Sequence, residues 1–122
     1  MTDHLVSTDS GKSLNFRAHP WHGVSLGDNW PEVVNTYIEV VPSDTVKYEL
    51  DKETGVLMLD RPQLYYCIYP SLYGMLPKTY CGRRIGEFCS RKSGRHGIMG
   101  DRDPLDICVM SEKNVPHGDI LL

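Results

Sequence analysis

The sequence predicts a mainly β domain in which short strands form a small β-barrel. Segments of alternating apolar and polar residues recur between turn residues, and no segment shows a convincing helical pattern. The chain has 122 residues, which suits one domain, and its content of 40% hydrophobic and 24% charged residues is typical of globular proteins. The formal net charge of -3 gives the whole chain no large positive field to attract nucleic acid.

The N-terminal residues 1–17 are polar and are expected to form a flexible tail, followed by a domain over residues 18–122. The tail lacks the apolar stretch of a secretion signal, and no apolar run approaches the ~20 residues that span a bilayer. A cytoplasmic protein with no membrane partner is therefore expected. Residues 18–31 are irregular, and Trp21 and Trp30 are expected to anchor them to the core because each has a large area to bury.

The first expected strand begins at Asn35. Alternation places Tyr37, Glu39 and Val41 on one side of the extended chain, with the two residues between them on the other side.

A β-hairpin is expected next. Residues 45–50 alternate between apolar and charged positions, and residues 56–60 form the returning strand. The five residues 51–55 between them end in Gly55, and hairpin loops favour glycine at such a position.

The C-terminal half is expected to be less regular. Residues 63–80 carry five tyrosines with Pro70 and Pro77, which argues against a helix and for an irregular aromatic layer. Residues 82–99 are basic and rich in glycine, and are expected to form a loop or insertion. Apolar residues at 105–110 and 119–122 indicate two further strands.

The four cysteines, Cys67, Cys81, Cys89 and Cys108, are expected to be reduced, small, buried apolar groups. Two disulfides are the alternative that an even count permits, but the chain has no secretion signal and is not dense in cysteine. Zinc is a further alternative, although Cys81, Cys89 and His96 lack the paired spacing of a zinc knuckle.

Three carboxylates lie within six residues, at Asp101, Asp103 and Asp106. They repel one another unless a cation lies among them, and aspartate oxygens suit magnesium or calcium. Pro104 favours an extended Asp103, and Asp106 opens an expected strand that would be a rigid base for a ligand. The spacing is not that of an EF-hand. Both a metal site and a solvated acidic turn are compatible with this pattern.

A second charged group lies on the expected hairpin. Lys47 and Glu49 share one face of a strand, and Arg61 lies on the antiparallel return. Cations bind phosphate and carboxylates bind a metal, so this arrangement suits a metal-bound phosphate anion. A cross-strand ladder of salt bridges on a solvated face is the alternative.

Several segments together resemble family I soluble inorganic pyrophosphatases, over about residues 18–122. The resemblance rests on Ala18-His19-Pro20-Trp21-His22-Gly23, the run from Val46 to Gly55, Asp60-Arg61, Tyr69-Pro70 with Tyr73-Gly74, and Asp101-Arg102-Asp103-Pro104-Leu105-Asp106. It implies an OB-like, five-stranded β-barrel with flanking helices. It also implies hydrolysis of pyrophosphate to two orthophosphates with several Mg²⁺ ions, in a homo-oligomer.

The same resemblance implies roles for individual residues. Asp103 is expected to accept a proton from the attacking water, and the expected metal ligands are Asp101 and Asp106. The expected contacts to substrate phosphate are Lys47, Arg61 and Tyr73. Supporting positions in or beside the cavity are Glu39, Glu49 and Tyr69.

The chain departs from the family pattern in three places. Arg102 stands where a small residue is common, and a positive φ there would cost arginine about 1 kcal/mol or more. The basic segment 82–99 is longer than in many bacterial members, and could steer anions, form a subunit contact or be a plain insertion. The family's second acidic cluster, its Tyr-Lys pair and its C-terminal helix do not occur before Leu122. We therefore expect this chain to be a truncated barrel with little or no activity, the activity belonging to an intact parent protein.

Two other functions stay open from the residues. An OB-type module could bind single-stranded nucleic acid by stacking bases on Tyr65, Tyr66, Tyr69, Tyr73 and Tyr80. The net acidic charge and the three aspartates argue against this, so no nucleic-acid partner is expected. A non-catalytic fragment that pairs with other subunits through an open strand edge is the other alternative.

Overall fold

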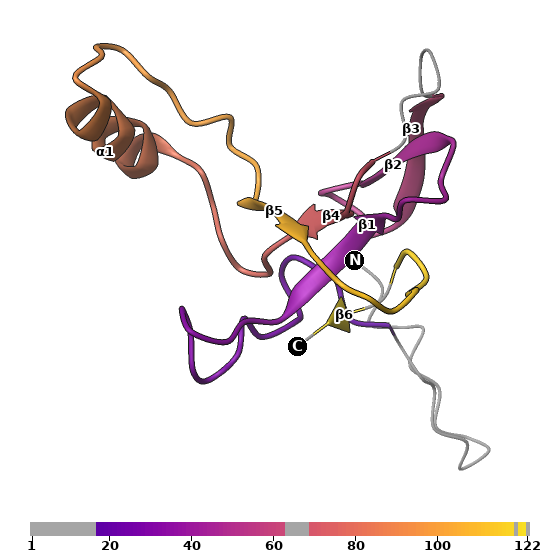
Figure 1. Ribbon diagram of the computed structural model, residues 1–122. Helices are drawn as coiled ribbons and strands as arrows, with labels where there is room; N and C mark the ends of the chain where they lie inside the picture. Colours follow the sequence, from indigo (N-terminus) through magenta and orange to yellow (C-terminus); the bar gives the residue numbers. More distant parts are fainter. Residues whose placement is uncertain (1–16, 63–68, 119, 122) are drawn as a thin grey trace.

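The computed structural model describes residues 17–62, 69–118 and 120–121. Within these ranges the fold has six strands and one helix, so the mainly β prediction is confirmed (Figure 1). The elements are β1 (Thr36–Val40), β2 (Val46–Leu50), β3 (Leu57–Pro62), β4 (Leu72–Met75), α1 (Arg83–Ser93), β5 (Asp106–Val109) and β6 (Ile120–Leu121).

The described strands form two antiparallel sheets. Four strands are ordered β5-β4-β1-β6, and β2 pairs with β3 as a separate hairpin. The Glu39 side chain of β1 joins them, since its Oε2 accepts a hydrogen bond of 2.6 Å from the backbone N–H of Leu50 in β2. The Glu39 side chain thus links the two sheets by a hydrogen bond of the kind that backbone groups form within a sheet.

Strand β1 contains a bulge at Glu39. Ile38 pairs with Gly74 of β4, whereas Val40 pairs with Tyr73, so Glu39 is the extra residue. Bulges bend a strand and redirect a side chain, often beside active sites.

The bulge corrects one expectation about side-chain direction. Strict alternation placed Val41 on the side of Tyr37, but Val41 packs in a cluster with Ile38 and Leu72. One inserted residue shifts the period by one, and every later side chain changes face.

The expected hairpin is confirmed. Lys47 pairs with Arg61 and Leu50 with Leu57, and the ladder has a second irregularity between Lys47 and Tyr48. In the turn, Gly55 has φ of 76°. This conformation is open to glycine at little cost, which explains why the turn ends there.

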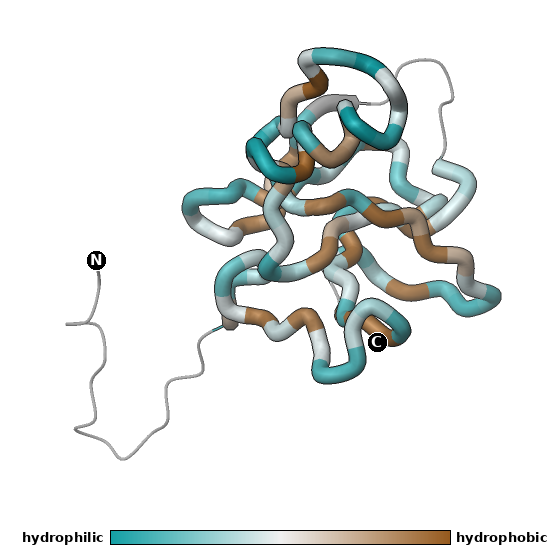
Figure 2. The backbone as a smooth tube through the Cα atoms, turned by 90° about the vertical axis from the view of Figure 1, so that its left-hand side faces the viewer, coloured by the Kyte–Doolittle hydropathy of each residue, from teal (hydrophilic) through white to brown (hydrophobic). Residues whose placement is uncertain are grey.

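Hydrophobic and hydrophilic residues alternate along much of the chain, as the colours of the backbone in Figure 2 show. Apolar side chains pack in two clusters. The first cluster contains Tyr37, Leu50 and Met75 with Trp21 and Leu57 packed against it, and the second contains Ile38, Val41 and Leu72 with Val109 and Val115. Trp21 therefore anchors its segment as expected. The same expectation is wrong for Trp30, which is 63% exposed.

The expected loop at 82–99 is wrong over most of its length, because residues 83–93 form α1, which extends away from the strands (Figure 1). Ile85, Phe88 and Cys89 have the spacing of one helical face. The helix ends at Gly94, which adopts a left-handed φ of 70°, a common way for helices to end. Strand β4 likewise lies within residues 63–80, where an irregular layer was expected.

The described cysteines Cys81, Cys89 and Cys108 are free, as expected, but none of the three is buried: Cys81 and Cys89 are half-buried and Cys108 is exposed. Cys67 lies outside the described residues. Residues 1–16 of the expected tail, 1–17, also lie outside them, and its last residue, Arg17, donates a hydrogen bond of 2.6 Å to the Gly118 carbonyl. In the described part of the chain, no helix is long and apolar enough to cross a membrane.

Candidate active site

One polar cavity of about 190 Å³ lies where the hairpin meets the four-stranded sheet. Five carboxylates and two lysines face it, together with one tyrosine. The lining residues are Glu39, Lys47, Glu49, Lys52, Tyr73, Met75, Asp101, Asp103, Pro104 and Asp106. A cavity with so many charges of both signs suits a small, highly charged ligand better than an apolar one.

Lys47 on β2 is held by two carboxylates. Its Nζ lies 3.3 Å from Glu49 Oε2 and 3.6 Å from Asp60 Oδ2. Burial alone would lower the pKa of Lys47, but the hydrogen bond and charge of Glu49, with the charge of Asp60, raise it instead. Lys47 therefore presents a fixed positive charge to the cavity.

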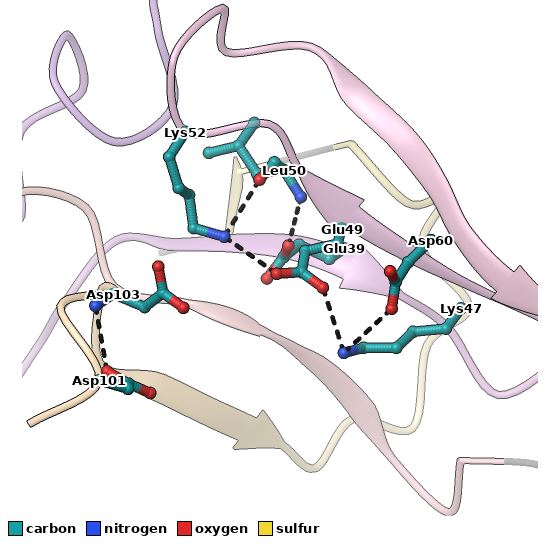
Figure 3. Close-up of polar contacts among 8 residues, drawn as sticks. All are labelled: Glu39, Lys47, Glu49, Leu50, Lys52, Asp60, Asp101 and Asp103. Carbon is teal, nitrogen blue, oxygen red and sulfur yellow. Dashed lines mark hydrogen bonds and ion pairs between the residues drawn. The ribbon is translucent and has the colours of Figure 1, made fainter.

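Lys52 follows β2 in the hairpin turn and is a second cation of the cavity. Its Nζ lies 3.4 Å from Glu49 Oε1 and 3.1 Å from the Leu50 carbonyl oxygen. Figure 3 shows Lys47 and Lys52 approaching Glu49 from two sides. Burial tends to raise the pKa of Glu49, but the two lysines outweigh it and lower the value. Sequence reasoning assigned no role to Lys52, although it lies in the same charged run as Lys47 and Glu49.

Glu39 is the most enclosed of the acidic groups, with 5% of the residue exposed. Burial raises the pKa of its carboxyl, the Leu50 N–H and the charge of Lys52 lower it, and the charges of Glu49 and Asp106 raise it further. A buried carboxylate in this position favours a nearby cation, because a cation restores the favourable electrostatics lost on burial.

Tyr73 on β4 connects the sheet to the acidic segment. Burial, and then the hydrogen bond that its hydroxyl donates to Asp106, raise the pKa of Tyr73 well above its ordinary value. The Tyr73 hydroxyl therefore acts as a hydrogen-bond donor without carrying charge. Tyr69 lies beside it with ring centroids 5.4 Å apart, so it supports Tyr73 and does not itself line the cavity.

The acidic loop, residues 101–106, is held by main-chain bonds. Asp103 O accepts from Cys81 N at 2.8 Å, and Arg102 N donates to Cys81 O at 2.9 Å. The Asp103 N–H also donates to Asp101 Oδ1 at 3.0 Å, as Figure 3 shows. Arg102 has φ of 67°, so the positive φ considered from the sequence is present and the residue is strained.

A profile described as "Inorganic pyrophosphatase" matches residues 36–122, which include every residue of the cavity. The chain belongs to the inorganic pyrophosphatase family. This confirms the resemblance drawn from the charged run of β2 and from the acidic loop.

Individual relatives agree with this assignment. The inorganic pyrophosphatase of Chlamydia trachomatis serovar L2 is 56% identical over 105 residues, covering 86% of this chain and 50% of the relative. The soluble inorganic pyrophosphatase of Zea mays is 32% identical over 121 residues, covering 99% of this chain and 47% of the relative. The chain thus spans about half the length of the curated relatives it matches.

Solved structures of inorganic pyrophosphatases share the fold, which confirms the OB-like class. The enzyme of Thermus thermophilus aligns with a TM-score of 0.64 at 30% identity, covering 84% of this chain and 48% of that chain. The type I inorganic pyrophosphatase of Toxoplasma gondii aligns with a TM-score of 0.68 at 23% identity, over 85% of this chain and 48% of that chain. The second likeness concerns the fold alone.

The donor chemistry of the pyrophosphatase cavity fits a hard divalent cation, because Mg²⁺ favours carboxylate oxygens. Within the described residues, no three His, Cys, Asp or Glu side chains already form a group that could hold an ion. Asp101 Oδ1 accepts the Asp103 N–H, and Glu49 lies between two lysines. A cation would therefore have to draw these carboxylates towards itself on binding.

Most residues that the sequence singled out meet in this cavity. Those that line it are Glu39, Lys47, Glu49, Tyr73, Asp101, Asp103 and Asp106. Arg61 is placed only by its backbone, which pairs with Lys47, since its side chain lies outside the described part.

Proposed function

We propose that the cavity serves the magnesium-dependent hydrolysis of inorganic pyrophosphate to two orthophosphates. The observation that carries this proposal is the convergence of five carboxylates and two lysines on one small cavity. Carboxylates suit divalent cations, lysines suit phosphate oxygens, and pyrophosphate bound to Mg²⁺ needs both. Membership of the inorganic pyrophosphatase family supports the same substrate.

In this proposal the acidic loop binds the cation and accepts the proton of the attacking water. Asp101 and Asp106 bind Mg²⁺, and Asp103 accepts the proton of the attacking water. A bound divalent cation lowers the pKa of a water molecule and offsets charge on the phosphoryl oxygens. Asp103 suits its role because Pro104 follows it and a main-chain bond from Cys81 N holds its carbonyl, so the base is pre-positioned.

The hairpin and β4 bind the substrate. Lys47 offsets charge on the leaving phosphate, as positioned cations do in phosphoryl transfer. Arg61 is assigned to the same task because its backbone lies opposite Lys47. Tyr73, whose hydroxyl is a donor next to Asp106, would donate its hydrogen bond to a phosphate oxygen. Glu39, Glu49 and Tyr69 hold these groups in place.

The test compares Asp103→Asn with Asp28→Asn, which makes the same change on an exposed aspartate outside the cavity. Both substitutions are made in a protein of the full length of the curated relatives, of which this chain spans about half. Binding of pyrophosphate with Mg²⁺ is measured by titration calorimetry, and turnover by phosphate release. Asp103→Asn should retain binding and lower phosphate release by about 10²- to 10⁴-fold, the usual contribution of a general base. Asp28→Asn should match the unaltered chain. Absence of pyrophosphate binding in the presence of Mg²⁺ would refute the proposal.

Three finer points belong to the proposal. Magnesium is the expected cation, and replacing it with Ca²⁺ should retain binding while lowering turnover, since Ca²⁺ accepts looser geometry. The protein is expected to form a homo-oligomer, which light scattering after size-exclusion chromatography would test. A cytoplasmic location is expected, and fluorescence microscopy of a tagged protein would test it.

A further inference from the structure

The turn at residues 19–23 is organised around the His19 ring. Its Nδ1 accepts hydrogen bonds from the backbone N–H groups of Trp21 at 3.2 Å and His22 at 3.3 Å. A nitrogen that accepts two N–H groups carries no proton, so the other ring nitrogen, Nε2, carries it. His19 Nε2 lies 3.1 Å from the Lys52 carbonyl oxygen, to which it donates.

The His19 ring also packs closely against the hairpin turn. A Cβ built on Gly55 would lie 2.7 Å from His19 Cδ2, closer than real contacts allow. Gly55 is needed at this point for close approach as well as for its φ of 76°. The ring is therefore fitted to the 51–55 turn, and the hydrogen bond to Lys52 is part of a packed contact.

The 19–23 turn is also hydrogen-bonded to the segment that follows β4. The Trp21 indole Nε1 donates to the Thr79 carbonyl at 2.7 Å, and Lys78 N donates to Trp21 O at 2.9 Å. The Thr79 hydroxyl in turn accepts from Leu105 N at 2.8 Å, within the acidic loop. The 19–23 turn thus connects the backbone of Lys52, a cavity lysine, with the acidic loop.

Lys52 depends on such a connection. Its Nζ contacts, Glu49 Oε1 and the Leu50 carbonyl, both belong to β2. These contacts orient the ammonium relative to β2, but they do not set the distance from Lys52 to the aspartates across the cavity. A small displacement of a positioned charge lowers binding and turnover substantially.

We propose that His19 is a positioning residue for the substrate site: it fixes the Lys52 backbone so that the Lys52 ammonium faces the acidic loop across the cavity. The value of this placement for pyrophosphate rests on the proposed function. The placement of Lys52 itself does not, and it is measured separately below.

Two substitutions of His19 separate its two hydrogen-bonding roles. His19→Asn puts an oxygen near the place of Nδ1 and can still cap the turn, but it cannot reach Lys52. His19→Gln puts an N–H₂ group near the place of Nε2 and can still donate to Lys52, but it leaves the turn amides without their acceptor. If His19 only stabilised the turn, neither variant would change the reactivity of Lys52, whereas a positioning His19 makes the two variants differ in that reactivity.

The first readout needs no substrate. The rate of reductive methylation of Lys52, followed by mass spectrometry, is compared with that of the exposed Lys113 in the same sample. His19→Asn should raise the Lys52 rate about 3- to 10-fold relative to Lys113, the range that loss of one such hydrogen bond gives. His19→Gln should leave it within about twofold. Equal Lys52 rates in all three chains would overturn the proposal.

The second readout is the affinity for pyrophosphate with Mg²⁺, measured in a protein of the full length of the curated relatives. His19→Asn should weaken it about 3- to 10-fold and His19→Gln by less than about twofold, although His19→Gln should lower the thermal midpoint more. In a Lys52→Met background, His19→Asn should add no further loss, since it acts through Lys52. An additional full loss in that background would overturn the proposal. A chain that binds no pyrophosphate refutes the proposed function, while the methylation rates still decide the role of His19.

Discussion

Replacing Glu39 tests whether one side chain holds the two sheets together. Glu39→Ala removes the acceptor of the buried Leu50 N–H, whereas Glu39→Gln keeps an acceptor and the side-chain volume. An unsatisfied buried donor costs about 1–3 kcal/mol, and a lost buried CH₂ group costs about 0.8 kcal/mol. Glu39→Ala should therefore unfold with a free energy about 2–4 kcal/mol lower than that of Glu39→Gln.

The assay is urea unfolding followed by tryptophan fluorescence, because Trp21 packs against the cluster that contains Leu50. With an ordinary urea dependence, a loss of 2–4 kcal/mol shifts the midpoint by about 1–3 M. Unfolding free energies for Glu39→Ala and Glu39→Gln that agree within about 0.5 kcal/mol would refute the bridging role.

The same pair of chains predicts a pH effect. Burial raises the pKa of Glu39 above its ordinary value of 4.5, so the unfolded chain ionises before the folded one as pH rises. The unaltered chain should then lose stability relative to Glu39→Gln from about pH 4.5 up to the folded pKa, and stay level above it. Unfolding at several pH values between 4 and 8 measures this, and a rise in the stability of the unaltered chain relative to Glu39→Gln with increasing pH would contradict the raised pKa.

Three other substitutions address the loop, the lysine pair and the helix. Arg102→Gly should raise the free energy of unfolding by up to about 1 kcal/mol, because glycine adopts the left-handed φ without strain, and it should also tighten Mg²⁺ binding. Lys78→Gly, at φ of 57°, should change stability alone. Calorimetric titration with Mg²⁺ distinguishes the two variants. Lys47 lowers the pKa of Glu49 in the folded chain, so ionised Glu49 contributes stability that is lost as pH falls through that folded pKa. Lys47→Met should therefore lose less stability on acidification than the unaltered chain. Urea unfolding between pH 6 and pH 3 measures the difference. Gly86→Ala would place a Cβ 2.6 Å from a backbone carbonyl oxygen. The overpacking should cost about 1–3 kcal/mol, which exceeds the gain of about 1 kcal/mol in helix propensity. Amide hydrogen exchange in α1 should therefore become faster.

Structural features that depend only on residues close together in the sequence were predictable. The hairpin followed from alternation and from a turn that ends in Gly55, and both have the expected positions. Asp106 opens a strand as expected, and the positive φ that was considered for Arg102 is present. In each case the determining residues are neighbours in the chain, so local rules suffice.

Features set by distant partners were not predictable. The bulge at Glu39 exists only in the register of β1 against β4, so no pattern within residues 35–41 reveals it. Lys52 gains its place from the His19 ring, 33 residues earlier in the chain. The helix α1 is a different case: its apolar spacing was present, but glycines and cations obscured it, and Gly82 offers no side-chain cap.

Two main-chain hydrogen bonds, between Cys81 N and Asp103 O and between Arg102 N and Cys81 O, join the two ends of the segment that carries α1. Because these bonds hold the ends of the segment together, changes at its far end need not alter the distance between Cys81 and the acidic loop. The outer side of α1 is thus a suitable place for a fluorophore, an epitope or an immobilisation tether. A short designed turn in place of residues 83–99 would give a compact version of the domain.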